Sequence, residues 1–125
     1  IGSNLITFHS LLGSSYCPSF KDAILFVEED EEESLFSFNR NLTSITLQPD
    51  FSLVKSIVFG RFQPESDITI ESLQAVVKNN PRLQRLPIIG GLDFGHTTPR
   101  LSLPIGGTVA VSANKEAIQV TIVKH

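Results

Sequence analysis

The chain has 125 residues, 41% hydrophobic and 18% charged, with a formal net charge of −3, which suits one small domain with a buried core and excludes wholesale disorder. Its ten Lys and Arg residues form no basic stripe, which argues against nucleic-acid binding, and no apolar run approaches the roughly 18 to 20 residues that span a bilayer. A single cysteine, Cys17, excludes an internal disulfide and a cysteine-based zinc cluster.

The first half of the chain predicts two helices around one buried strand. Ser3 and Asn4 precede apolar residues at helical spacing over 5–12, and Gly13 ends this helix. The continuous apolar run 23–27 is typical of a strand that is covered on both faces. Apolar residues spaced three and four apart over 35–45 predict the second helix.

The second half continues the alternation and ends in β-structure. We predict a strand over 54–59, a helix over 70–77 and a short strand over 87–89 that ends at the glycine pair 90–91, followed by a loop over 99–107. Residues 108–112 and 117–123 predict a β-hairpin that turns at 113–116. The order predicts an α/β fold: one small domain over 1–125, with a mixed, mainly parallel sheet flanked by helices and a C-terminal β-hairpin.

An acidic run over 28–33 holds six of the thirteen acidic residues. Acidic side chains in the first turn of a helix are favoured by the helix dipole, so residues 30–33 need no function. Glu28 differs from them because it directly follows the apolar strand. Ligands of open α/β sheets collect beyond the carboxyl ends of strands, and Glu28 is expected at such an end.

Two further segments, 60–63 and 90–96, follow predicted strands and bring His96 to the same edge. A carboxylate bonded to a histidine orients the imidazole as a general base and stabilises its protonated form, so Glu28 and His96 are a candidate pair. A loop histidine is also often an ordinary solvated side chain, and spacing alone leaves both interpretations open.

Other chemistry is poorly supported. The three histidines have no metal-ligand spacing, no glycine-rich phosphate loop or GxSxG motif is present, and Cys17 has no histidine or acid near it in sequence. His9 and His125 are expected to be structural or inert. The sequence therefore predicts no metal and no cofactor, and offers half of a catalytic triad without a nucleophile.

Several stretches resemble the LD-carboxypeptidase family, which includes muramoyltetrapeptide carboxypeptidases and microcin C immunity peptidases. The matching residues are 1–5, 11–13, 22–29, 57–62 and 94–106. The most specific is Phe-Gly-His at 94–96 followed by Leu-Pro-Ile-Gly at 103–106. The resemblance extends from Ile1 to about Ser112 and is to the C-terminal domain of the family.

The resemblance implies a Ser-Glu-His triad that is split over two domains. Glu28 and His96 match the family's glutamate and histidine, and the nucleophilic serine and oxyanion hole belong to an N-terminal domain that precedes this chain. A chain that starts at Ile1 and lacks Met fits a piece of a longer protein. The resemblance implies a cytoplasmic protein that acts on a peptide and needs no metal. It implies no binding to membrane or nucleic acid. Many members of the family are homodimers, so the whole protein is expected to form one as well.

Two departures from the family pattern concern the substrate. The family's Gly-Gly-Asn-Leu is Gly2-Ser3-Asn4-Leu5 here, and Gln63 stands where the immunity branch has an acid that holds the substrate amino group. Asn4 and Gln63 are therefore candidate substrate-binding residues. The leading hypothesis is hydrolysis of an L,D-peptide bond in murein peptides. The alternatives are a microcin C immunity-type peptidase that acts on peptidyl-adenylates and a non-catalytic binding domain of the same fold.

Overall fold

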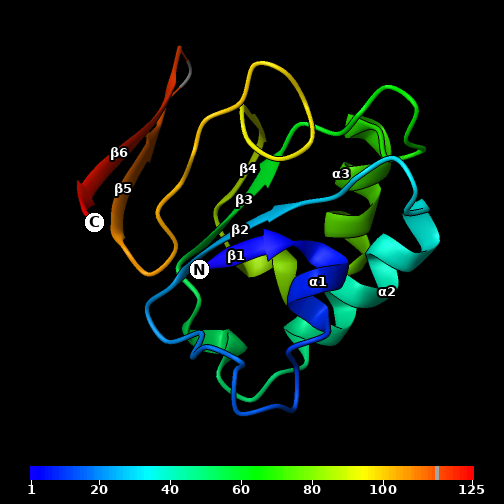
Figure 1. Cartoon of the computed structure of the whole chain (residues 1–125). Coiled ribbons are helices and arrows are strands. Elements are labelled where there is room, and N and C mark those ends of the chain that lie inside the picture. The colour runs from blue at the N-terminus through cyan, green and yellow to red at the C-terminus, as the bar shows by residue number, and fades with distance from the viewer. Residues whose placement is uncertain (115) are drawn as a thin grey trace.

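Four parallel strands form the central sheet, in the order β1-β2-β3-β4 (Figure 1). They are β1 (Gly2–Asn4), β2 (Ile24–Glu28), β3 (Ser56–Gly60) and β4 (Ile88–Leu92). The computed structural model describes residues 1–114 and 116–125. Because the strands are adjacent in sequence order and parallel crossovers are right-handed, the three connections place their helices on the same face of the sheet.

The helices on this face begin where short polar side chains cap them. They are α1 (Leu5–His9), α2 (Leu35–Thr46) and α3 (Ile70–Asn79), with short 3₁₀ turns at Phe51–Leu53 and Leu83–Arg85. Asn4, Ser34 and Thr69 are the N-caps, and each accepts a hydrogen bond from a backbone N–H in the first turn. Such caps satisfy amide groups that have no partner inside the helix.

Side-chain alternation along the strands divides the core into two apolar clusters, one on each face of the sheet. Leu25 and Val27 of β2 belong to the larger cluster beneath the helices. Phe26 points to the opposite face and belongs to the smaller cluster, with Val58 and Phe94. The hairpin of β5 (Thr108–Ala113) and β6 (Ile118–Lys124) covers this second face, and Figure 1 shows it on the side of the sheet away from the helices. Glu28 is two residues after Phe26 in β2, so its side chain also points to the hairpin face.

The predicted fold class is confirmed: one small α/β domain with a parallel sheet, flanking helices and a C-terminal hairpin. The hairpin forms a two-stranded sheet of its own and adds no strand to the parallel sheet. It is joined to the second face through apolar contacts of Val109, Val111 and Val120. The predicted hairpin turn includes Lys115, which lies outside the described residues.

The main differences from the predictions concern the first helix, strand β1 and strand β4. The first helix ends at His9, because the amides of Leu11 and Leu12 bond to carbonyls three residues back and the chain continues as tight turns. Strand β1 was not predicted, since three residues without a β-branched side chain give no pattern. Strand β4 continues through the glycine pair to Leu92, because it is an edge strand that pairs with β3 alone.

Two phenylalanines of α2 allow a matched test of this core. The side chain of Phe38 is fully buried against the rings of Phe59 and Phe62, whereas Phe36 is 75% exposed. We expect Phe38→Ala to lower the free energy of unfolding by about 3–5 kcal/mol, the usual loss for a buried aromatic ring. Phe36→Ala should change it by about 0.5 kcal/mol or less. Urea titrations of the two variants measure both values, and equal losses would contradict the described packing.

Candidate active site

A buried carboxylate and a partly exposed imidazole meet at the carboxyl edge of the sheet. Glu28 is the last residue of β2 and His96 lies in the loop after β4. His96 Nδ1 and Glu28 Oε2 are 2.7 Å apart, and the side chains are 46% and 7% exposed. The structure therefore brings together the two residues that the sequence predicted as a pair.

The charge of the surroundings favours the protonated form of this histidine. The hydrogen bond to Glu28 raises the pKa of His96, as do the negative charges of Glu28, Asp30 and Glu29, while partial burial opposes the rise. An ionised carboxylate only accepts hydrogen bonds, so Nδ1 carries the proton in this contact. The other ring nitrogen, Nε2, is then left to exchange a proton with a third group.

Gly95 allows the His96 loop to approach Glu28 so closely. Its φ is +95°, and a Cβ atom at this position would stand 2.5 Å from Glu28 Oε2 and 2.7 Å from Glu28 Cγ. Its neighbour Phe94 is buried in the second cluster, with its ring edge-to-face on Phe26 at a centroid distance of 5.7 Å. The loop is thus anchored by an apolar ring on one side of Gly95 and by the carboxylate contact on the other.

Glu29 has a structural position that sequence reasoning missed. In the sequence it was only one of the six acids of the run 28–33, but in the structure its side chain is fully buried. It accepts hydrogen bonds from the Asn4 side-chain amide, from the Ile6 backbone N–H at 3.1 Å and from the Asp30 backbone N–H at 3.3 Å. Burial raises the pKa of Glu29, and these donors partly offset the rise. The contact was not predictable because Asn4 and Glu29 lie 25 residues apart in the sequence.

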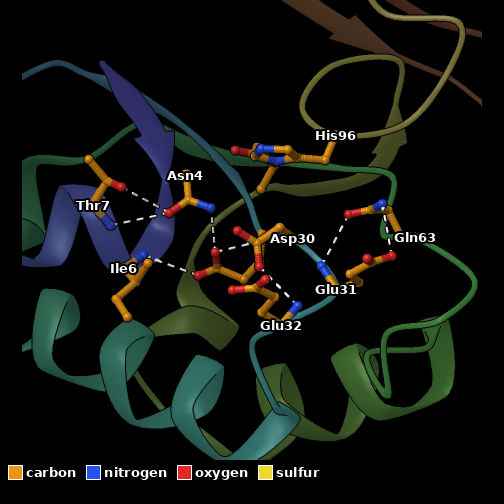
Figure 2. Close-up of polar contacts among 10 residues, drawn as sticks. Asn4, Ile6, Thr7, Asp30, Glu31, Glu32, Gln63 and His96 are labelled. Carbon is orange, nitrogen blue, oxygen red and sulfur yellow. Dashed lines mark hydrogen bonds and ion pairs between the residues drawn. The ribbon is translucent and has the colours of Figure 1, made fainter.

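Asn4 and Gln63, the two predicted substrate-binding residues, have their described side-chain hydrogen bonds to residues outside the dyad, although Asn4 is the register partner of Glu28 across β1 and β2. Asn4 bonds to Glu29, and its Oδ1 accepts from the Thr7 backbone N–H at 3.2 Å. Gln63 Oε1 accepts from the Glu31 backbone N–H at 3.1 Å, and its Nε2 donates to the Glu31 carboxylate. Figure 2 shows the two amides on either side of the acidic segment that follows β2. Their binding role stays a prediction.

The placement of acids 30–33 in the first turn of a helix was wrong. Helix α2 begins at Leu35, with Ser34 as its N-cap, and has no acid in its first turn. The Leu35 backbone N–H donates instead to Asp67 Oδ1 at 2.6 Å. The acids form the turn before the helix, where Glu32 N–H donates to Asp30 Oδ1 (Figure 2). This turn brings the charge of Asp30 near His96.

The remaining candidates stay outside this site. His9 is the last residue of α1, Cys17 is a half-buried free thiol, and His125 is exposed. Across residues 1–114 and 116–125, no three or more His, Cys, Asp or Glu side chains are grouped to hold a metal ion. Within the same ranges no helix has the length and apolar character to cross a membrane.

An α/β domain with a carboxylate–histidine pair at the carboxyl edge of its sheet has the arrangement that hydrolases use to activate a nucleophile. The model of the family described as LD-carboxypeptidase C-terminal domain matches residues 1–111. The chain belongs to this family. The resemblance found in the sequence is thereby confirmed.

Known proteins of both branches are similar to this chain. It is 41% identical to an MccF-like protein from Bacillus anthracis, with a TM-score of 0.94. The match covers 100% of this chain and 39% of the Bacillus anthracis chain. A muramoyltetrapeptide carboxypeptidase from Oxalobacter formigenes is 25% identical, with a TM-score of 0.79. This match covers 95% of the present chain and 42% of the Oxalobacter formigenes chain. YocD of Bacillus subtilis, which is named as a carboxypeptidase, is 38% identical over the whole chain. The chain spans 36–38% of the length of the curated relatives that it matches.

The raised pKa of His96 predicts a pH-dependent contribution to stability. Because the folded-state pKa lies above the ordinary value of 6.5, this contribution is fully present below pH 6.5 and is lost as the pH rises through the folded-state pKa. We expect Glu28→Gln to remove most of it, and exposed Glu32→Gln to retain it. Urea unfolding between about pH 5 and pH 8 measures the difference. A pH profile unchanged by Glu28→Gln would contradict the charged hydrogen bond.

Gly95→Ala separates a steric effect from backbone strain. Gly106 shares the positive φ, at +85°, but a Cβ there has no atom within 4 Å. Gly106→Ala should lose about 1–2 kcal/mol of stability, because it places an L-residue in a left-handed conformation. Gly95→Ala should lose more, because the added Cβ also clashes with Glu28. Only Gly95→Ala should displace Glu28 from His96 and lower the pKa of His96, which an NMR titration of the imidazole follows. If Gly106→Ala lowers that pKa equally, the close approach at Gly95 is not the cause.

Proposed function

We propose that this chain is the acid–base half of a serine-type LD-carboxypeptidase that hydrolyses an L,D-peptide bond in murein peptides. The observation that carries the proposal is the 2.7 Å contact between His96 Nδ1 and Glu28 Oε2 on a domain of this family. Glu28 is the buried partner that holds the imidazole, and His96 is exposed enough to face a second domain. The nucleophilic serine and the oxyanion hole are supplied by an N-terminal domain of the same polypeptide.

The mechanism follows from the protonation states of this pair. As the serine Oγ attacks the scissile carbonyl carbon, His96 Nε2 accepts the hydroxyl proton, and Glu28 stabilises the resulting imidazolium. The C–N bond then breaks, and the leaving amine takes the proton from Nε2. His96 Nε2 then accepts a proton from water as the water oxygen attacks the acyl carbon. When the second intermediate collapses, the C–Oγ bond breaks and the serine Oγ takes that proton from Nε2. The elevated pKa of His96 supports the cationic form on which the leaving group depends.

A nucleophile outside this chain is supported by the relatives. The chain accounts for little more than a third of their length, which leaves room for a further domain. A solved structure of MccF, 29% identical over 83% of this chain with a TM-score of 0.66, is described as an active-site mutant with a serine, an asparagine and a lysine replaced by alanine. That description places a serine in the active site of MccF. By analogy, we expect the 125-residue chain alone to be inactive on any peptide.

The second candidate substrate is a peptidyl-adenylate of the microcin C type. It is favoured by the 41% identity to an MccF-like protein and by the complex of MccF with glutamyl sulfamoyl guanosine. Gln63 argues the other way, since an amide holds a substrate ammonium less strongly than a carboxylate does. The ratio of kcat/KM for a murein tetrapeptide and for a peptidyl-adenylate decides between them. Turnover of neither, in a protein without an upstream serine, would favour the non-catalytic binding domain.

The setting of the reaction is part of the same proposal. We place it in the cytoplasm, in the recycling of murein peptides, and propose a homodimer for the whole protein. Size-exclusion chromatography with light scattering tests the dimer, and a murein peptide that accumulates in a deletion strain tests the recycling role. A monomer, or unchanged peptide pools, would remove the corresponding part of the proposal.

Replacement of either member of the dyad tests the mechanism. In the whole protein, we expect His96→Gln and Glu28→Gln each to lower kcat by about 10⁴-fold, the scale of losses in other triads, with the fold intact by circular dichroism. The matched control is Glu32→Gln, which removes an exposed acid from the same segment and should keep normal turnover. A folded His96→Gln protein with normal turnover would exclude His96 from the mechanism.

A further inference from the structure

Arg61 contacts both ends of the loop that carries His96. It directly follows β3, and its backbone N–H donates to the Leu92 carbonyl at 3.1 Å. Its Nε lies 2.7 Å from Asp93 Oδ1, before His96, and its Nη2 donates to the Pro99 carbonyl at 2.8 Å, after His96. One guanidinium therefore bridges two points that flank the histidine.

The loop is closed at its base as well. The Leu101 backbone N–H donates to the Asp93 carbonyl at 2.7 Å, so residues 93–101 form a ring with His96 near its middle. Inside this ring, His96 is held by Glu28, and the missing side chain of Gly95 lets the backbone lie against that carboxylate. The Arg61 bridge fixes the side of the ring that these contacts do not reach, at Pro99.

We propose that Arg61 is a positioning residue that holds the His96 loop in the conformation in which the imidazole meets Glu28. Arginine suits this task because its rigid, planar guanidinium can pair with the Asp93 carboxylate on one side and donate a hydrogen bond to the Pro99 carbonyl on another, whereas a lysine ammonium is a single point charge on a flexible stem. The ion pair itself is half exposed, with side chains 36% and 46% accessible, so it adds little to global stability. Its contribution is geometric: it restrains residues 97–100, between the Glu28 contact of His96 and the backbone hydrogen bond of Leu101.

The electrostatic and the positioning effects of Arg61 have opposite signs at His96. Removal of a nearby positive charge alone raises the pKa of an imidazole, whereas a looser contact with Glu28 lowers it. The charged groups that raise the pKa of His96 are Glu28, Asp30 and Glu29, from the segment at the end of β2. The Arg61–Asp93 ion pair lies at the base of the His96 loop, and its two charges oppose each other. The direction of the pKa change therefore reports which effect dominates.

The experiment uses the whole protein and two readouts: the pKa of His96 by NMR, assigned with His96→Gln, and kcat and KM on the peptide substrate. We expect Arg61→Gln to lower the pKa of His96 and to lower kcat about 10- to 100-fold with little change in KM, since a displaced catalytic group slows the chemical step. Arg61→Lys keeps the charge and should show a smaller loss in both. Arg100→Gln, which removes an exposed charge from the same loop, should change neither.

The rate readout rests on the proposed function, but the pKa readout does not. A lowered pKa of His96 in a whole protein that lacks peptidase activity supports the positioning role and rejects the proposed function. An active protein in which Arg61→Gln raises or retains that pKa, and Arg61→Lys leaves it unchanged, rejects the positioning role alone. If Arg61→Gln does not fold by circular dichroism, Arg61→Lys decides the question, because an unchanged pKa and kcat in that variant overturn the proposal.

Discussion

Successive side chains of a β-strand point to opposite faces of its sheet, and at the end of β2 this rule separates two neighbouring carboxylates. Glu28 extends to the hairpin face and meets His96, while Glu29 is buried next to α1 and accepts from Asn4 and Ile6. Both are almost inaccessible to solvent, at 5% and 0% exposure. The first acid orients an imidazole, and the second joins β1 and α1 to the end of the same strand. The register of β2 thus fixes both contacts at once.

Much of the fold could be predicted because its elements follow apolar periodicity. Helix α2 and strand β3 each have a continuous pattern of apolar residues, so the spacing of these residues identifies the first as a helix and the second as a strand. Strand β1 and the independence of the hairpin could not be predicted, because both depend on partners distant in sequence. Pairing of β1 with β2 requires a register that three residues do not encode. The hairpin attaches through side-chain packing, which has no sequence signature.

The candidate site divides in a similar way. Glu28 and His96 were predicted from strand ends and from the family resemblance, and the contact between them is present. The burial of Glu29 was missed, because six consecutive acids look the same in sequence whichever of them turns inward. The contacts of Arg61 were also missed, since Asp93 and Pro99 lie 32 and 38 residues away and no sequence pattern links them to Arg61. What the sequence lacks in each case is the pairing of side chains across the sheet edge.

The small apolar cluster on the hairpin face affects how the His96 loop and the dyad come apart when the domain opens locally. Phe94 belongs to that cluster and is two residues from His96, whereas the larger cluster lies on the far side of the sheet. Native proteins open in local cooperative units, and units with few buried contacts open first. Because Phe94 anchors the loop in this cluster, separation of the hairpin layer would release the loop and break the dyad without disturbing the larger cluster beneath the helices. The amides of the 93–101 loop should therefore exchange with deuterium earlier than those of β2 and β3, and thermal loss of the dyad should precede the melting of the helical layer.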